Sequence, residues 1–365
     1  MSRKLTYDSW LFGAAILIVV LGVVMIYSAS AIIAIQRYGT ADPYHFMTRQ
    51  LVWLFAGGAL MLLLMHVDMT LLQDRRLLYA GLTCVGIALV VALFQSPING
   101  THRWIVLPWF NLQPSEFAKP VLVLFAAAFL ARREEKINEL TTTLLPLLSI
   151  LCLFAGLILL GRDFGTAAMV LLVGFAMIFV AGVSWRLIGL ISVPIVPVLV
   201  VLGLSAAYRR NRLFAFLNPE ADPLGKGFQA LQSLIALGTG GVSGLGIGNG
   251  RQKLFFLPEP HTDFIFSIVG EELGFVGAFA LICAFAFLVW RGFRLARFTE
   301  DRFAFYAAVG LTLMIGLQAL INISVALCLL PTKGIGLPLV SYGGSSLIAS
   351  LMAVGILLNF SQQAS

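Results

Sequence analysis

The chain of 365 residues is 59% hydrophobic and only 11% charged. Soluble domains carry roughly 25% charged residues, so this composition excludes an ordinary soluble enzyme and predicts a membrane protein. The formal net charge of +7 does not predict nucleic-acid binding, because the Lys and Arg residues are spread over short segments between apolar blocks.

Apolar blocks long enough to cross a bilayer recur along the whole chain. A helical span needs about 20 apolar residues, and about ten such blocks predict an all-α polytopic membrane protein. We expect a single membrane domain over residues 1–365, with one long extracytoplasmic loop, 208–262, between spans seven and eight. The predicted spans are 10–34, 51–67, 77–95, 115–131, 141–161, 165–183, 187–207, 263–290, 303–329 and 343–360.

The basic residues of the short loops predict the orientation. With the N-terminus inside, twelve of these Lys and Arg residues face the cytoplasm and six face outward, as the positive-inside rule requires. An even number of spans returns the C-terminus to the cytoplasm. The segments 35–50, 96–114, 208–262 and 330–342 are then expected outside.

Ionisable side chains gather at the predicted outer ends of the spans. Charges at membrane depth are costly, so each is a candidate functional residue. Cations there can neutralise a pyrophosphate, and a carboxylate can take a proton from a hydroxyl. The set comprises Arg103, Glu116, Lys119, Asp163, Asp263, Glu271 and Lys333, with His102 and His261 nearby.

Asp263 is the strongest single candidate, because it lies where the long outer loop meets the eighth span. The alternative is that Thr262 or Asp263 merely caps that helix. Glu271 and Glu272 follow on different helix faces, so we expect that they do not share one site and that one pairs with a cation. Gln318 and Asn322, four residues apart, share a helix face and suit helix–helix hydrogen bonding.

Two motifs and the cysteines carry weaker signals. The run 238–250 lacks the context of a Rossmann turn or a P-loop, so a flexible or packed loop is expected, with a phosphate cradle as the alternative. Small residues over 341–346 favour close helix packing. The cysteines have no CxxC pair, and we expect small buried side chains at Cys84, Cys152, Cys283 and Cys328.

Taken together, the motifs resemble the SEDS family (shape, elongation, division and sporulation) of bacterial peptidoglycan glycosyltransferases, over nearly the whole chain. The form of 252–263 and 330–334 is closer to the division and sporulation branch than to the rod-elongation branch, and the division member is the best match. Arg162 departs from the family, which often has Pro there. The matching motifs are His102-Arg103-Trp104-Ile105, Gln113-Pro114-Ser115-Glu116, Asp163-Phe164-Gly165-Thr166, Gly225-Lys226-Gly227-Phe228-Gln229, Pro258-Glu259-Pro260-His261-Thr262-Asp263-Phe264 and Ser341-Tyr342-Gly343-Gly344-Ser345-Ser346.

This resemblance implies polymerisation of lipid II into glycan at the outer face of the bacterial inner membrane, at the division septum. It implies Asp263 as the catalytic carboxylate, with Asp163, Glu271 and Glu272 in supporting roles. Side chains expected to bind the pyrophosphate or the sugar are Arg103, Lys119, Glu116, His261, Lys333 and Ser341. No cofactor is assigned, and a divalent cation, Mg²⁺ or Mn²⁺, at Asp263 stays open.

The resemblance also implies partners: a class B penicillin-binding protein that acts as transpeptidase, other divisome proteins and membrane lipids. Two other functions stay open at this point. A lipid II flippase also needs intramembrane charges and a broken span, but it should line the cytoplasmic half as well. A non-catalytic divisome scaffold would tolerate Asp263→Asn.

Overall fold

A computed structural model gives the arrangement of the chain. It describes residues 7–37, 42–98, 100–108, 110–191, 227–254, 256–332 and 334–362, together with the single positions 193, 197, 201, 210 and 216. Most of the predicted seventh span, 187–207, and much of the predicted loop 208–262 lie outside the described residues, as do Lys226 and Lys333.

Helices make up most of the described chain, which confirms the all-α polytopic class. Within these ranges, eight helices are long and apolar enough to cross a membrane, and α7 is a shorter apolar helix. The main helices are α1 (Ser9–Arg37), α2 (His45–His66), α4 (Arg75–Phe94), α5 (Pro114–Ala131), α6 (Leu145–Leu160), α7 (Phe164–Val180), α11 (Ile265–Phe298), α12 (Arg302–Ala326) and α13 (Gly344–Ser361).

Several helices differ in length from the predicted spans. Helix α2 begins at His45 rather than near 51, and α11 continues to Phe298 rather than ending near 290. Hydropathy detects only the segment that suits lipid, whereas backbone hydrogen bonding carries a helix on into polar surroundings. The extension of α11 carries three arginines, Arg291, Arg294 and Arg297.

The remaining elements are short. Strands β1 (Ile105–Val106) and β2 (Asn111–Leu112) form an antiparallel pair, with Ile105 opposite Leu112. The others are α3 (Met69–Leu72), a 3₁₀ turn (Glu134–Lys136), a π-helical turn (Leu140–Leu144) and α10 (Phe228–Gly240).

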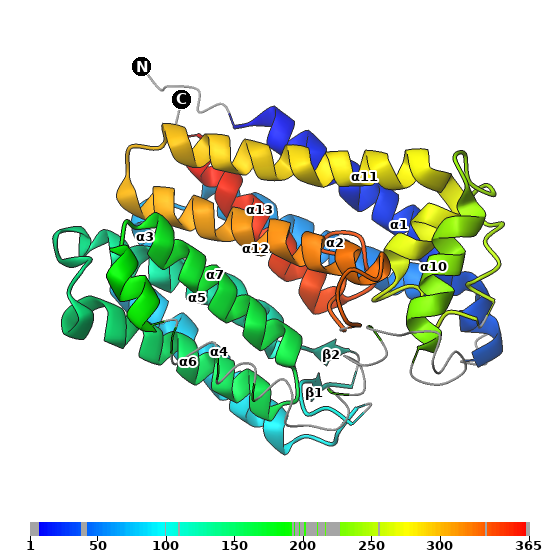
Figure 1. Cartoon of the computed structure of the whole chain (residues 1–365). Coiled ribbons are helices and arrows are strands. Elements are labelled where there is room, and N and C mark those ends of the chain that lie inside the picture. Colours follow the sequence, from blue (N-terminus) through cyan, green and yellow to red (C-terminus); the bar gives the residue numbers. More distant parts are fainter. Residues whose placement is uncertain are drawn as a thin grey trace.

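The helices run roughly parallel or antiparallel in one bundle (Figure 1). Helices α5, α12 and α13 are the most buried of the spans. Helices α2 and α13 approach closely through glycines: a Cβ on Gly344 would meet the Trp53 ring at 2.4 Å, and one on Gly355 would meet the Met61 carbonyl at 2.6 Å. Small residues thus set this contact, as in other membrane helix pairs.

Both ends of the chain lie at one end of the bundle (Figure 1). The Asp8 amide donates to Ser361 Oγ at 2.9 Å, and the Asp8 carboxylate pairs with Arg291 at 2.5 Å. The opposite end carries α10, the β1–β2 hairpin and the start of α11 (Figure 1); we call it the Asp263 end.

The expectation for the cysteines is wrong for three of the four. Cys84, Cys152 and Cys283 are exposed on the outside of their helices, and only Cys328 is partly covered. A cysteine is apolar enough to face lipid as readily as a protein core, so its place in an apolar span does not predict burial.

Candidate active site at the Asp263 end

Asp263 and Arg103 meet at Gly334. Asp263 lies just before α11, Arg103 just before β1, and Gly334 between α12 and α13. A Cβ built on Gly334 would lie 3.3 Å from Asp263 Oδ2 and 3.7 Å from Arg103 Nη1. Three segments far apart in the sequence therefore place a carboxylate and a guanidinium over one small backbone position.

Asp263 is not the cap of α11. The N-cap position is Phe264, without a side-chain cap hydrogen bond. The Thr262 hydroxyl donates back to the Glu259 carbonyl at 3.2 Å. The capping alternative is therefore wrong, and Asp263 is only partly buried.

Buried polar side chains hold the backbone on both sides of Asp263. Asn322 Nδ2 donates to the Asp263 and Ile335 carbonyls, each at 2.8 Å. Ser341 Oγ donates to the Thr262 carbonyl at 2.5 Å and accepts from the Leu337 amide at 2.7 Å. The loop between α12 and α13 is thereby joined to the residues that carry Asp263.

One helix turn below Asn322, Gln318 extends the same framework. Its Nε2 donates to the Gly336 carbonyl at 3.0 Å. From α2, Gln50 Nε2 donates to the Ser341 carbonyl at 3.3 Å and Gln50 Oε1 accepts from the Gly343 amide at 3.2 Å. The shared face of Gln318 and Asn322 thus supports a loop rather than only another helix, and Gln50 is a support that the sequence analysis missed.

Ser341 was expected to bind substrate, but its hydroxyl is fully engaged with backbone groups. We expect Ser341→Ala to cost roughly 1–3 kcal/mol of stability, because the Leu337 amide loses its buried acceptor. Turnover should fall several-fold with little change in KM, since Asp263 shifts. Ser346→Ala is the matched control, since Ser346 is a half-buried serine five residues further along the chain, in the first turn of α13. Equal activity of both variants would contradict the positioning role.

Arg103 has donor capacity that the described protein does not use. Its Nε is buried and has no hydrogen-bond partner among the described residues. The guanidinium carbon lies 5.6 Å from the Trp104 ring centroid. A planar guanidinium with unused donors suits a pyrophosphate, which it can bind through two parallel hydrogen bonds.

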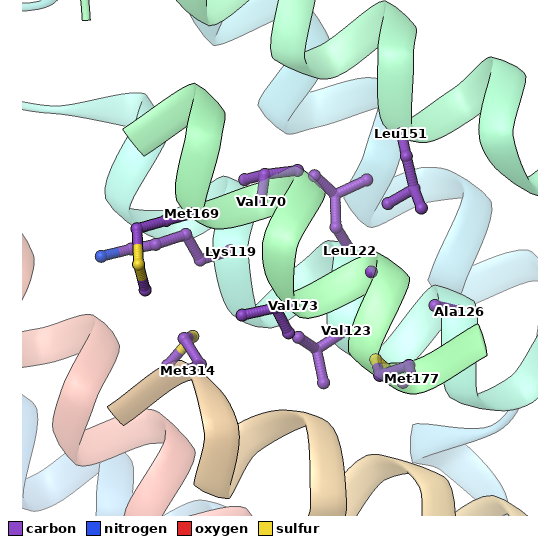
Figure 2. A pocket seen from close by; sticks show the side chains of 11 residues that line it. Lys119, Leu122, Val123, Ala126, Leu151, Met169, Val170, Val173, Met177 and Met314 are labelled. Atoms are coloured by element: carbon purple, nitrogen blue, oxygen red, sulfur yellow. The ribbon is translucent and has the colours of Figure 1, made fainter. Parts of the chain in front are cut away.

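Glu116 and Lys119 form a buried pair inside the bundle. Lys119 Nζ lies 2.8 Å from Glu116 Oε2 and 2.6 Å from Gln318 Oε1. Lys119 is the one charged side chain lining an otherwise apolar, narrow cavity between α5, α6, α7 and α12, shown with Met169 and Met314 in Figure 2. The pair supports the framework through Gln318, and both charged side chains are buried among the helices.

Asp163 and His261 are also buried within the protein. Asp163 caps α7 through the Thr166 amide at 3.2 Å, and its other oxygen accepts from Gln113 and Ser115, each at 3.1 Å. The His261 ring packs between Phe46 and Tyr342, with centroids 4.7 and 5.6 Å away. Asp163 is thus engaged by hydrogen bonds within the protein, whereas His261 packs against aromatic rings.

Glu272 pairs with Lys253, a residue that the sequence analysis did not assign. The Lys253 Nζ lies 2.6 Å from Glu272 Oε1, and their side chains are only 3% and 0% exposed. The same ammonium donates to Ser28 Oγ of α1 at 2.9 Å. The sequence did contain a signal, because Glu272 in an apolar span requires a cation.

Glu271 and Glu272 do point at one place, contrary to expectation. Glu272 accepts from the Gly248 amide at 3.1 Å and Glu271 from the Arg251 amide at 2.7 Å. The loop 241–252 wraps around α11 at Gly274, where the helix breaks with φ 67°. Its amides bind carboxylates of the chain itself, so the packed-loop interpretation applies and the phosphate cradle does not.

Comparison with known proteins places this site in a family. The family model of the cell cycle proteins FtsW, RodA and SpoVE matches residues 8–365. The probable peptidoglycan glycosyltransferase FtsW of Geobacter metallireducens is 41% identical over 97% of this chain and 94% of its own. Stage V sporulation protein E of Bacillus subtilis is 40% identical, with 99% and 98% covered.

A solved structure agrees. The chain is similar to one chain of a peptidoglycan synthase complex, described for its structural coordination of polymerization and crosslinking. The TM-score is 0.78 at 33% identity, with 98% of each chain covered. The resemblance inferred from the motifs is confirmed: the chain belongs to the FtsW/RodA/SpoVE family of cell cycle proteins, the SEDS family.

Proposed function

We propose that this membrane-bound peptidoglycan glycosyltransferase joins lipid II units at the Asp263 end, with Asp263 and Arg103 as its central residues. The observation that carries this proposal is their meeting at Gly334. A base and a fixed cation close to one small backbone position suit a sugar transfer with a pyrophosphate leaving group.

In the proposed reaction, Asp263 takes the proton from the 4-hydroxyl of the acceptor sugar. The hydroxyl oxygen attacks the anomeric carbon of the donor, and the bond from that carbon to the pyrophosphate breaks with inversion. The undecaprenyl pyrophosphate that leaves carries the bonding electrons, and Arg103 stabilises its charge. The framework of Asn322 and Ser341 keeps Asp263 in place throughout.

A divalent cation fits this site only if protein and substrate both supply its ligands. Within the described ranges, no group of three or more His, Cys, Asp or Glu side chains could hold a metal ion. Mg²⁺ is often held by one or two carboxylates together with substrate phosphates and water, and Asp263 would be the protein ligand here. When bound, such an ion would neutralise negative charge on the leaving pyrophosphate.

The proposal includes a location and partners. Orientation by basic residues puts the Asp263 end outside the bacterial inner membrane, and similarity to FtsW supports a role at the division septum. Similarity to a complex that coordinates polymerization and crosslinking supports a transpeptidase partner, a class B penicillin-binding protein. Other divisome proteins and the surrounding lipids complete the expected partners.

An assay of the purified protein together with its transpeptidase, supplied with fluorescent lipid II, distinguishes a polymerase from a flippase or a scaffold. We expect a ladder of glycan products on a gel, and none from the transpeptidase alone. Movement of lipid II across vesicles without a ladder would instead support the flippase. The absence of both activities from a folded complex would support the scaffold.

A further inference from the structure

An apolar groove opens on the membrane side of the bundle between α4 and α6. It has a volume of about 440 Å³, within the roughly 300–1,000 Å³ of typical ligand pockets. Its walls are Leu82, Thr83, Gly86, Ile87, Val90 and Val91 of α4 with Leu153, Phe154 and Leu157 of α6. Thr83 donates its hydroxyl to the Tyr79 carbonyl at 2.8 Å, so the groove offers an unbroken hydrocarbon surface.

The groove lies in the half of the membrane nearer the Asp263 end. Helix α4 runs toward that end and stops at Phe94, while α6 stops at Leu160. The lining from Leu82 to Val91 covers about 13 Å along the helix axis, which is close to half of a bilayer core of about 30 Å. A lipid in the outer leaflet would have its chain at this depth.

The segment that carries Arg103 is anchored at the outer ends of the two groove helices. His102 joins the ends of both helices: its amide donates to the Gly161 carbonyl at 3.2 Å, and its Nδ1 lies 3.0 Å from the Gln95 carbonyl. The next residue is Arg103, whose buried Nε has no partner among the described residues. The residue next to this cation in the chain is therefore fixed to the outer ends of both helices that form the groove.

We propose that this groove holds the first isoprene units of the polyprenyl chain of the donor substrate, while Arg103 holds its pyrophosphate. The inference rests on the proposed function and adds the place of the lipid tail. Bilayer lipid solvates a prenyl chain as well as a groove does, so the groove supplies packing and orientation rather than hydrophobic energy. When Arg103 binds the pyrophosphate, the prenyl chain attached to it has a higher effective concentration at the groove than the chains of free phospholipids.

Filling the groove tests the proposal by chain-length dependence. A Cβ on Gly86 would meet only the Phe154 ring, at 3.6 Å, so Gly86→Phe should fold while it blocks the groove. We expect kcat/KM for undecaprenyl lipid II to fall roughly three- to tenfold, the scale of lost packing contacts, with little change for a short-prenyl analogue. Gly156→Phe is the matched control, because Gly156 lies on α6 in open space and outside the groove lining.

Photolabelling gives a second measurement that does not depend on the variants. A lipid II analogue with a diazirine in the isoprene units nearest the pyrophosphate should label residues 82–91 and 153–157. Undecaprenyl pyrophosphate should compete, excess phospholipid should not, and Arg103→Ala should weaken labelling. Labelling elsewhere, or equal competition by phospholipid, would overturn the inference. Wild-type polymerisation in the same sample distinguishes this failure from failure of the proposed function.

Discussion

Asp263→Asn is expected to lower lipid II polymerisation by roughly 10²–10⁴-fold, the usual contribution of a general base. The amide keeps the size of the side chain but cannot accept the proton. Folding should be unaffected, because Asn322 binds the main-chain carbonyl of residue 263, not its side chain. The ladder assay with initial rates measures the loss, and a thermal melt measures the folding.

The control for Asp263→Asn is Glu259→Gln in the same loop. Glu259 is a carboxylate four residues away whose side chain is 41% exposed and lies 4.0 Å from the buried His261. It should retain most of the activity. If both variants lost activity equally, the loop's charge rather than one base would explain the result.

Lys253→Met is expected to destabilise the protein by about 3–5 kcal/mol, the cost of leaving a buried charge without its partner. The Glu272 side chain, 0% exposed, would lose the ammonium that pairs with it. The double variant Lys253→Met with Glu272→Gln should recover much of this loss, because no buried charge is then left unpaired. Thermal unfolding of the purified wild type, the single variant and the double variant measures these differences in stability.

An exposed ion pair provides the contrast for this prediction. Arg302 and Glu134 lie 2.9 Å apart with side chains 60% and 43% exposed. Glu134→Gln should cost no more than about 1 kcal/mol, as is usual for surface pairs. A loss equal to that of Lys253→Met would show that burial does not control the contribution of these pairs.

The loop that Lys253 and Glu272 fix is the one that carries Asp263. The two charged residues lie before and after Asp263 in the chain, and their pairing closes that segment onto α11 while Ser28 ties it to α1. Variants of this pair should therefore reduce activity as well as stability. The activity that remains at low temperature separates the two effects.

The sequence was sufficient for the helical class, and it singled out Arg103 and Asp263, which the structure places together at Gly334. Long apolar blocks predict membrane helices because lipid solvates no free backbone groups. Arg103 and Asp263 stood out because charges in such a setting need a reason. Hydropathy could not define the full lengths of α2 and α11, since helices continue beyond the apolar segment.

Pairing across the bundle was the part that the sequence could not provide. Lys119 suggested a pyrophosphate ligand, but Gln318, 199 positions away in the chain, and Glu116 engage its ammonium. Ser341 suggested a substrate contact, but the Thr262 carbonyl accepts its hydrogen bond. A charged or hydroxyl side chain considered by itself suggests substrate binding. Its partners elsewhere in the fold decide whether its polar atoms are free to bind a substrate.

In the proposed mechanism, Asp263 acts in the chemical step and does not serve mainly to hold the substrate. The most direct test measures lipid II affinity and the single-turnover rate of glycosidic bond formation on the same preparations of wild type and Asp263→Asn. We predict nearly equal affinity and a rate reduced by roughly 10²-fold or more. An unchanged rate, or a loss explained entirely by weaker binding, would contradict the role of Asp263 as the general base.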